Sequence, residues 1–341
     1  MTNNFKQHSA LTRRRFMMEG AGAGLALVAA PGIRSARAAE DINFQLDWIA
    51  YGRHAPYYTA LDKGYYRERG LNVTIQQGRG TLQGIRTLIA GQSQFIFQDI
   101  GVMLAVRAKE GSKIKALACM YQKTPHTLFF IKNKGISKPK DLEGKKVAFS
   151  PGDSPRLMFP AFAKANNVDE SKVGWLSVDP NSKNAVLLNH AVDGMVTYLF
   201  TLPVLQKSAK AGDEVGTFVY GEWGADFYSN GIGAMEDYIK SKPEVTKNFV
   251  QATMQGVAHT LANPKEAVSI LKKYQAQLDE EVALKEIEII RTLSNASDPK
   301  QKLGFMSKEK MEETQELMVK YLDLKQRVPL EEAFTNEFLA A

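Results

Sequence analysis

Residues 43–76 constrain the fold more than any other part of the chain, because they read as a strand, a loop, a helix and a second strand in succession. Apolar and polar residues alternate over residues 44–48 and again over 71–75, which is the two-residue period of a strand. Pro56 fits the first turn of a helix, where its missing N–H would be unpaired anyway, and Gly64 can end that helix. The segment is therefore predicted to be one unit of an α/β fold.

The loop between this strand and this helix carries Trp48, Tyr51, Arg53 and His54. Ligands of open α/β sheets bind at the carboxyl ends of the strands, so the loop is predicted to contact a ligand. Trp48 and Tyr51 are suited to clamp a planar molecule, although Trp48 equally suits a core position that closes the sheet. His54 either contacts a ligand heteroatom or bonds to its own helical turn.

The N-terminus has three features of an export signal in the expected order. Consecutive arginines at 13–15 precede a weakly apolar, Gly- and Ala-rich run at 20–33, and a small-x-small cleavage motif follows at 36–38. This order resembles a twin-arginine signal peptide spanning residues 1–38. The apolar run is shorter than the ~20 residues that a membrane-spanning helix needs.

Most of the net charge belongs to this segment. It holds six of the 44 basic residues and one of the 37 acidic ones, so the net charge of +7 falls to +2 for residues 39–341. The basic pI is consequently no indication of nucleic-acid binding. The single cysteine, Cys119, excludes an internal disulfide and suits a small buried apolar position. An exported protein of this length does not need disulfides for stability.

Strands and helices alternate in two series, over residues 39–120 and 128–220, and the pattern from Pro243 to Phe338 is helical. We therefore expect two lobes, the first formed by residues 39–124 with 227–341 and the second by residues 125–226. The chain would cross twice between them, which places a cleft between the lobes and a hinge at the crossings. Asp226, near the second crossing, is expected to form hydrogen bonds at this hinge.

Two Gly-rich loops, one in each lobe, lie between a predicted strand and the start of the following predicted helix. Thr81 and Gln83 lie in the first and Ser150 and Ser154 in the second, and free N–H groups at such helix starts suit a carboxylate, sulfonate or phosphate. The neighbouring residues Arg79 and Arg156 either bind the anion or lie in solvent.

Three further positions are candidate ligand contacts. Asp99, at the end of the third strand, either binds a ligand amine or caps the following helix. Tyr198 and Trp223 are expected on the far wall of the cleft. The histidines show no metal-ligand spacing, so no metal site is predicted.

Several short segments resemble the SsuA/THI5-like (NMT1) family: LDW at 46–48, KGYY at 63–66, GLNVTI at 70–75 and DLEGKKV at 141–147. The resemblance runs over most of residues 42–275. It implies a two-lobed type II periplasmic binding protein fold. Most family members deliver small molecules such as thiamine pyrimidine precursors, riboflavin, sulfonates or nitrate to an ABC importer.

The binding loop departs from the pattern of the pyrimidine-binding relatives, D-W-x-P-N-x-x-H. Ala50 and Tyr51 stand where those relatives have proline and asparagine, so a pyrimidine is one candidate among heteroaromatic and anionic ligands. The family also includes thiamine pyrimidine synthases of the THI5 type, which need a lysine for pyridoxal phosphate, a nearby histidine and cysteines for iron. Residues 98–104 contain neither lysine nor histidine, and residues 223–229 contain no cysteine.

The sequence thus predicts a binding protein and not an enzyme, without cofactor, exported to the periplasm by a twin-arginine signal. Its partners would be a small-molecule ligand and the permease and ATPase of an ABC importer, with no nucleic acid. It is expected to be a monomer. The alternative is a THI5-type synthase.

Overall fold

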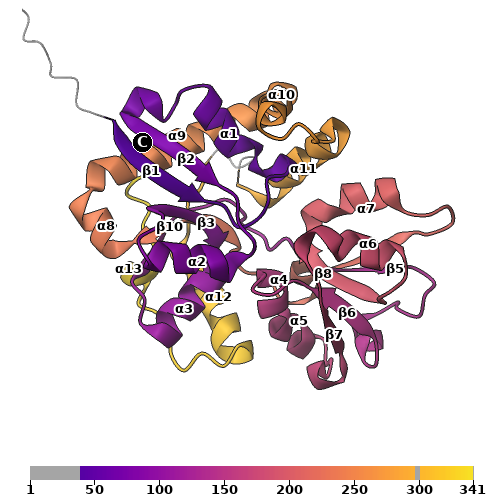
Figure 1. Cartoon of the computed structure of the whole chain (residues 1–341). Coiled ribbons are helices and arrows are strands. Elements are labelled where there is room, and N and C mark those ends of the chain that lie inside the picture. Colours follow the sequence, from indigo (N-terminus) through magenta and orange to yellow (C-terminus); the bar gives the residue numbers. More distant parts are fainter. Residues whose placement is uncertain (1–38, 296–299, 341) are drawn as a thin grey trace, which may run out of the picture. The chain divides into compact units, whose positions relative to one another are not determined.

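The computed structural model describes residues 39–295 and 300–340, so the expected signal peptide lies outside the described residues. Two five-stranded mixed sheets organise the described chain, and Figure 1 shows each with its own helices. We call the first sheet and its helices lobe 1, and the second sheet with α4 to α7 lobe 2. The predicted boundaries between the lobes, after residues 124 and 226, stay a prediction.

The sheet of lobe 1 has the strand order β2-β1-β3-β10-β4. Its strands are β1 (Glu40–Gln45), β2 (Leu71–Gln76), β3 (Phe95–Asp99), β4 (Ile114–Cys119) and β10 (Asn230–Met235). β1 is parallel to β2 and β3, and β10 runs antiparallel between β3 and β4. The first strand ends at Gln45, three residues earlier than the alternation predicts, which frees residues 46–48 for the loop.

Strand β10 is absent from the sequence prediction because it is rich in glycine. A Cβ at Gly231 would come within 2.3 Å of the Ala118 carbonyl oxygen, and one at Gly233 within 2.5 Å of the Met103 sulfur. Close packing on both sides therefore selects glycines, which weaken the apolar alternation by which a strand is recognised. This strand returns the chain from lobe 2 to the first sheet, where it lies between β3 and β4.

The sheet of lobe 2 has the order β7-β6-β8-β5-β9. Its strands are β5 (His126–Ile131), β6 (Lys146–Phe149), β7 (Gly174–Ser177), β8 (Gly194–Tyr198) and β9 (Val215–Val219), and its helices are α4 (Ser154–Leu157), α5 (Phe159–Ala165), α6 (Lys183–Leu188) and α7 (Leu202–Ser208). β6 is parallel to β7 and β8, whereas β5 is antiparallel to β8 and β9.

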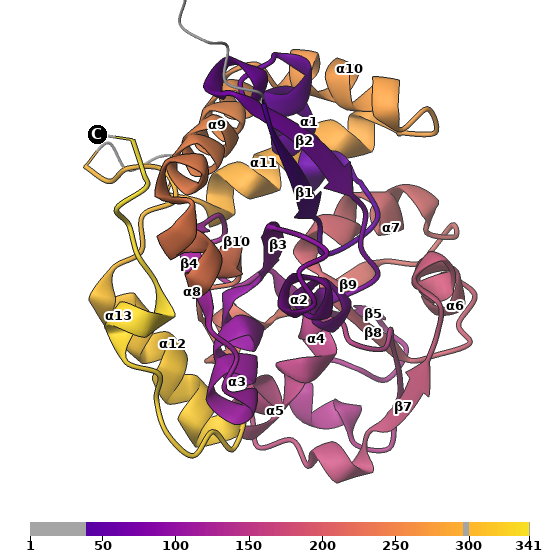
Figure 2. The same cartoon turned by 60° about the vertical axis from the view of Figure 1, so that its left-hand side comes forward.

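The helices of lobe 1 include the long C-terminal series. They are α1 (Ala55–Asp62), α2 (Thr81–Ile89), α3 (Ile100–Glu110), α8 (Glu236–Ser241), α9 (Pro243–Ala262), α10 (Pro264–Tyr274), α11 (Glu280–Leu293), α12 (Lys308–Tyr321) and α13 (Leu330–Ala333). α9 packs along α1, and Figure 2 shows the two side by side above β1 and β2. The helical pattern predicted from Pro243 to Phe338 is confirmed for α9 to α13, but the described residues between α11 and α12 and those on either side of α13 are not helical.

Buried aromatic side chains join the sheet and helices of lobe 1. The rings of Phe95 on β3 and Phe249 on α9 stack with centroids 3.9 Å apart, and Cys119 is buried as predicted. Where the chain crosses between the lobes, the Thr124 amide donates a 3.0 Å hydrogen bond to Asp226 Oδ1. Asp226 also pairs with Lys310 on α12, so the hydrogen-bonding role expected of Asp226 is confirmed.

Candidate functional site

A cavity of about 460 Å³ lies between the two lobes. Lobe 1 contributes the loop that follows β1 and the first turns of α11, and lobe 2 contributes residues around α6 and the segment from β8 to α7. The side chains that the argument below uses are Trp48, Tyr51, Arg53, Asp153, Lys183, Tyr198, Phe200 and Glu286. Its volume is in the usual range for small-molecule sites.

The loop after β1 holds its shape through backbone hydrogen bonds to the loop after β2. The amide of Gly80 donates to the Asp47 carbonyl oxygen at 2.9 Å, and the amide of Gly78 donates to that of Trp48 at 3.1 Å. A Cβ at Gly78 would come within 2.2 Å of the Leu46 carbonyl oxygen, so this approach requires glycine. The bracing places Trp48 and Tyr51 in the cavity wall, where both were predicted.

Beneath this loop, Asp47 is buried between Arg53 and His54. Its Oδ2 lies 2.9 Å from Arg53 Nη2, and its Oδ1 lies 2.9 Å from His54 Nε2. Burial alone would raise the pKa of Asp47, but the Arg53 guanidinium and the His54 ring together hold it below its ordinary value. Asp47 therefore stays a carboxylate that neutralises Arg53.

His54 is a structural residue in this arrangement. Its Nδ1 accepts a 3.1 Å hydrogen bond from the Tyr51 amide, and burial lowers its pKa to about 4. The ring is accordingly neutral, with Nε2–H donating to Asp47. His54 does not line the cavity, so the interpretation in which it bonds to its own turn is the one that the structure supports.

Lobe 2 supplies the opposite wall. The Arg53 guanidinium carbon lies 5.1 Å from the centre of the Tyr198 ring and 5.7 Å from that of Phe200, within cation–π range. Lys183 forms a buried ion pair with Asp153, and its ammonium lies 5.4 Å from the centre of the Trp48 ring. Both cations in the wall thus already have a carboxylate partner.

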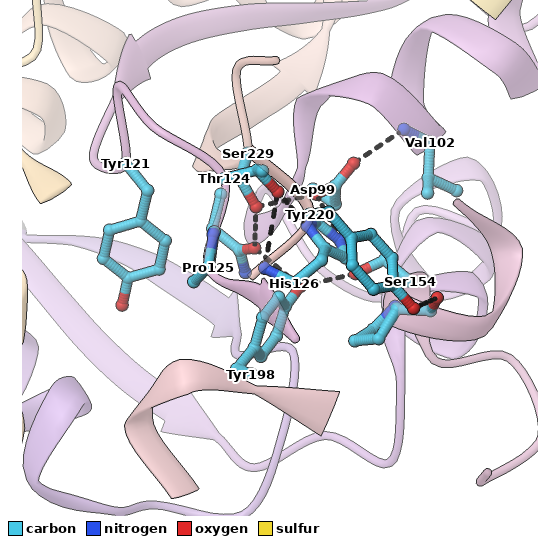
Figure 3. A network of polar contacts seen from close by, with 12 residues as sticks. Asp99, Val102, Tyr121, Thr124, Pro125, His126, Ser154, Tyr198, Tyr220 and Ser229 are labelled. Carbon is cyan, nitrogen blue, oxygen red and sulfur yellow. Dashed lines mark hydrogen bonds and ion pairs between the residues drawn. The ribbon is translucent and has the colours of Figure 1, made fainter. Parts of the chain in front are cut away.

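A network of buried polar groups joins the lobes behind the cavity (Figure 3). His126 Nε2, on β5, lies 3.0 Å from Ser154 Oγ and 3.3 Å from Asp99 Oδ2, which belongs to lobe 1. Ser229 Oγ donates to the same Asp99 oxygen at 2.8 Å. Burial lowers the pKa of His126 to about 3 and raises that of Asp99 to about 7, so this contact joins a neutral ring to a carboxyl group that titrates near neutrality.

Asp99 and Ser154 were predicted to contact a ligand, and the structure places both in this network and outside the cavity lining. Asp99 also accepts a 3.0 Å hydrogen bond from the Val102 amide, which makes it the N-cap of α3. Ser154 hydrogen-bonds to the hydroxyl of Tyr198, a predicted ligand contact that does line the cavity. These two residues connect the lobes and the cavity wall, and their contact with a ligand stays a prediction.

The two Gly-rich loops contact each other. The Leu82 amide of lobe 1 donates a 3.2 Å hydrogen bond to the Gly152 carbonyl oxygen of lobe 2, so an N–H predicted to bind an anion is already occupied. Gln83 accepts from the Arg79 amide, and Ser150 donates to the Val178 carbonyl oxygen. Thr81, Gln83 and Ser150 do not line the cavity.

The remaining candidates lie elsewhere. Trp223 is 36 % exposed and packs edge-on against Phe218, 5.2 Å between ring centres, outside the cavity lining. Arg156 pairs with Glu170 at 2.9 Å and lies over the Trp175 ring, while Arg79 is exposed. Sequence reasoning missed Asp153, Lys183, Phe200 and Glu286.

Neither a metal centre nor a membrane span is found within the described ranges. Residues 39–295 and 300–340 bring together no group of three His, Cys, Asp or Glu side chains able to hold a metal ion. None of the helices in these ranges is both long and apolar enough to span a membrane.

Two α/β lobes that enclose a cavity between them define the two-lobed type II periplasmic binding protein fold, as predicted. Among solved structures, the alkanesulfonate-binding protein SsuA from Xanthomonas axonopodis pv. citri, bound to MOPS, superposes with a TM-score of 0.67 at 14 % identity, covering 88 % of this chain and 99 % of that one. The NMT1/THI5-like family model matches residues 52–267, and the chain belongs to this family.

Two curated relatives match nearly the whole chain. The riboflavin-binding protein RibY of Chloroflexus aurantiacus is 26 % identical, over 91 % of this chain and 89 % of its own length. The formylaminopyrimidine-binding protein of Halalkalibacterium halodurans is 24 % identical, over 88 % of this chain and 91 % of its own length. Synthases of 4-amino-5-hydroxymethyl-2-methylpyrimidine phosphate are also among the relatives.

Proposed function

We propose that this chain is the substrate-binding component of an ABC importer and that its ligand is a small heteroaromatic molecule. The observation that carries the proposal is the composition of the cavity, which has aromatic side chains in both of its walls. Trp48 and Tyr51 come from lobe 1, and Tyr198 and Phe200 come from lobe 2. Stacking on such rings adds roughly 0.5–1.5 kcal/mol for each pair beyond the burial of area.

The charges in the cavity wall favour a heteroaromatic ligand over an anionic one. Arg53 is neutralised by Asp47, and Lys183 by Asp153. A sulfonate or carboxylate would therefore meet no cation without a partner among these groups, and would also lie near the carboxyl group of Glu286. Two binding proteins that match nearly the whole chain are named for riboflavin and formylaminopyrimidine, both of which are heteroaromatic, whereas a relative that matches 60 % of the chain is named for taurine, a sulfonate.

Binding is expected to depend on closure of the lobes, because each wall belongs to a different lobe. A ligand that moves a hinge from 1:99 to 99:1 closed must bind the closed form better by ~5.5 kcal/mol. Stacking in both walls and hydrogen bonds to charged groups, worth about 1.5–3 kcal/mol each, supply free energy of this order. The closed protein would then dock on the permease, in the periplasm, after export by the twin-arginine signal.

The test is a thermal-shift screen of the exported protein against pyrimidines, flavins, sulfonates and aromatic acids, after native mass spectrometry for co-purified ligand. A ligand at 100 times its dissociation constant stabilises the fold by ~2.7 kcal/mol, which is readily measured. We expect a pyrimidine or flavin to bind, with binding weakened in Trp48→Ala and unchanged in Trp223→Ala. Absence of binding in every class would refute the proposal.

The family also includes synthases, but the residues of the cavity do not fit the pyridoxal phosphate that a synthase needs. Lys183 is the one lysine among the described residues that line the cavity. Its ammonium pairs with the Asp153 carboxylate and donates to the Val196 carbonyl oxygen. A Schiff base with pyridoxal phosphate needs a free amine in place of a paired ammonium. Pyridoxal phosphate or iron bound to the purified protein, without a hit in the ligand screen, would favour the synthase.

A further inference from the structure

Glu286 is a buried acid in the cavity wall. It projects from α11, lines the cavity and is only 4 % exposed. The Arg53 amide donates a 3.0 Å hydrogen bond to its Oε2. Within residues 39–295 and 300–340, no lysine, arginine or histidine side chain forms an ion pair with it. It differs in this respect from Asp47 and Asp153, the buried acids on either side of the cavity.

The position of this carboxyl group is fixed by the loop packed against α11. A Cβ at Gly52 would come within 2.5 Å of the Ala283 Cα and within 2.7 Å of Glu286 Oε2, so the backbone of the loop lies directly on the helix. Burial raises the pKa of Glu286 to about 7, although the N–H groups of Arg53 and Gly52 and the Arg53 guanidinium act in the opposite direction. A buried carboxylate with so few partners gains most from a further hydrogen-bond donor.

Arg53 offers the complementary group on the neighbouring loop. Its Nη2 pairs with Asp47, whereas its Nη1 is buried and has no hydrogen bond of normal geometry within the described chain. The buried Tyr121 hydroxyl lies close to the guanidinium, whose charge and hydrogen bonding lower the pKa of Tyr121 against a larger rise from burial. The cavity wall therefore holds an acceptor carboxylate close to a cation whose Nη1 lies outside the ion pair with Asp47.

We propose that Glu286 accepts a hydrogen bond from an N–H on the edge of a planar heteroaromatic ligand, and that Arg53 donates to an acceptor beside that N–H on the same edge. Such an edge is found in imides, lactams and amidines, which carry N–H next to C=O or next to a ring nitrogen. The inference rests on the proposed binding function and narrows it, since it names the groups that select the ligand.

The test begins on the ligand, because changing the ligand leaves folding intact. Riboflavin and N3-methylriboflavin form the pair if a flavin binds in the screen. If a pyrimidine binds, the pair is 4-amino-5-hydroxymethyl-2-methylpyrimidine and its 4-dimethylamino analogue. Methylation removes the N–H and adds volume where the carboxylate lies, so we expect the wild-type protein to bind the methylated member at least about 10-fold more weakly.

The variant arm asks whether Glu286 is the acceptor. In Glu286→Gln the amide oxygen can still accept from the Arg53 N–H. The NH₂ group of the glutamine then faces the ligand N–H, and two donors cannot form a hydrogen bond with each other. We expect Glu286→Gln to lose about 10-fold or more in affinity for the N–H ligand and to bind both members of the pair alike. Glu288→Gln is the matched control, because Glu288 is exposed on the same helix and pairs with Arg291 at 3.2 Å.

The outcomes separate this inference from the function on which it rests. Equal affinity of the wild-type protein for both members of the pair overturns the inference and leaves a heteroaromatic-binding protein. The inference also fails if Glu286→Gln keeps the wild-type preference, or if the screen yields only sulfonates such as taurine. A protein that binds no compound of any class refutes the binding function itself.

Discussion

The hydroxyl of Tyr198 in lobe 2 donates a 2.8 Å hydrogen bond to Asn230 Oδ1 in lobe 1. The Nδ2 of Asn230 in turn donates to Asp47 Oδ2 at 2.9 Å, beside the ion pair with Arg53. One cavity residue of lobe 2 is thereby connected to the charged base of the binding loop in lobe 1. Because the bond from Tyr198 to Asn230 joins the two lobes, it stabilises the arrangement in which they meet and depends on that arrangement.

Replacing Tyr198 by phenylalanine should therefore weaken ligand binding although the aromatic ring remains. We expect the dissociation constant to rise about 5- to 30-fold, because a buried hydrogen bond worth about 1–2 kcal/mol is lost from the closed state. Isothermal titration calorimetry measures the effect. Tyr65→Phe is the control, since the Tyr65 hydroxyl bonds to His259 within lobe 1. An equal loss of affinity in both variants would contradict the role assigned to Tyr198.

The two tryptophans predicted as ligand contacts should behave differently. Trp48→Ala removes an aromatic side chain from the cavity wall. We expect this variant to bind the ligand ~1–3 kcal/mol more weakly, through lost stacking and apolar burial. Trp223→Ala should leave affinity within twofold of wild type, because Trp223 packs on Phe218 outside the cavity. Quenching of tryptophan fluorescence during titration gives both affinities. A larger loss in Trp223→Ala would mean that the cavity is not the binding site.

Local patterns identified most of the fold and part of the binding loop. The alternation at 71–75 and the helix that begins near Pro56 are confirmed, because each depends on neighbouring residues. Trp48 and Tyr51 were placed in the cavity by the rule for strand ends, which is also local. Strand β10 escaped prediction, since the reason for its glycines is packing against Ala118 and Met103, which are distant in sequence.

The residues missed at the cavity escaped for the same reason. Glu286 lies in an apolar helical stripe that predicts core packing, and its contact with the Arg53 amide joins positions 233 residues apart. Lys183 looks like an ordinary surface lysine until the fold brings it to Asp153. The Gly-rich loops were predicted to bind an anion through free N–H groups, and a local pattern could not show that the Leu82 amide of one loop bonds to the Gly152 carbonyl oxygen of the other.

The stability of the protein should respond to pH through Asp99. Its pKa of about 7 in the folded protein lies above the ordinary value of 3.8, because burial opposes ionisation and the Asp47 carboxylate adds to the rise. Between about pH 4 and 7 the folded state thus holds a proton that the unfolded state has lost. The stabilisation is complete below pH 4 and falls as the pH rises towards 7, by up to about 1.4 kcal/mol per pH unit.

Asp99→Asn should remove this dependence, because the amide keeps an oxygen for the Val102 N–H but does not ionise. We expect its free energy of unfolding to rise relative to wild type from pH 5 to pH 7, as measured by urea titration at each pH. His54 and His126, whose lowered pKa values give the opposite slope, are present in both proteins and largely cancel in the comparison. Asp41→Asn, at an exposed position, serves as control, and parallel pH profiles for Asp99→Asn and wild type would refute the assignment.

Gly80 should control how closely the lobes approach. Its φ of 133° belongs to a region that side chains rarely enter, and a Cβ there would lie 3.0 Å from the Gly152 carbonyl oxygen of lobe 2. Gly80→Ala therefore strains the loop and also pushes on the opposite lobe. Gly91→Ala is the matched control, since Gly91 has a φ of 70° with no atom within 4 Å of the added Cβ. Both variants should lose stability, by about 1 kcal/mol at Gly91 and more at Gly80.

Only Gly80→Ala should also weaken ligand binding, because only its methyl group opposes the hydrogen bond from the Leu82 amide to the Gly152 carbonyl oxygen. We expect roughly tenfold weaker binding by calorimetry, and a larger radius of gyration for the ligand-bound protein by small-angle X-ray scattering. Stability and affinity separate the two effects: strain in the loop lowers stability in both variants, whereas a steric block between lobes acts on closure. If Gly80→Ala lost stability but bound ligand as tightly as Gly91→Ala, contact between the two Gly-rich loops would be dispensable for closure.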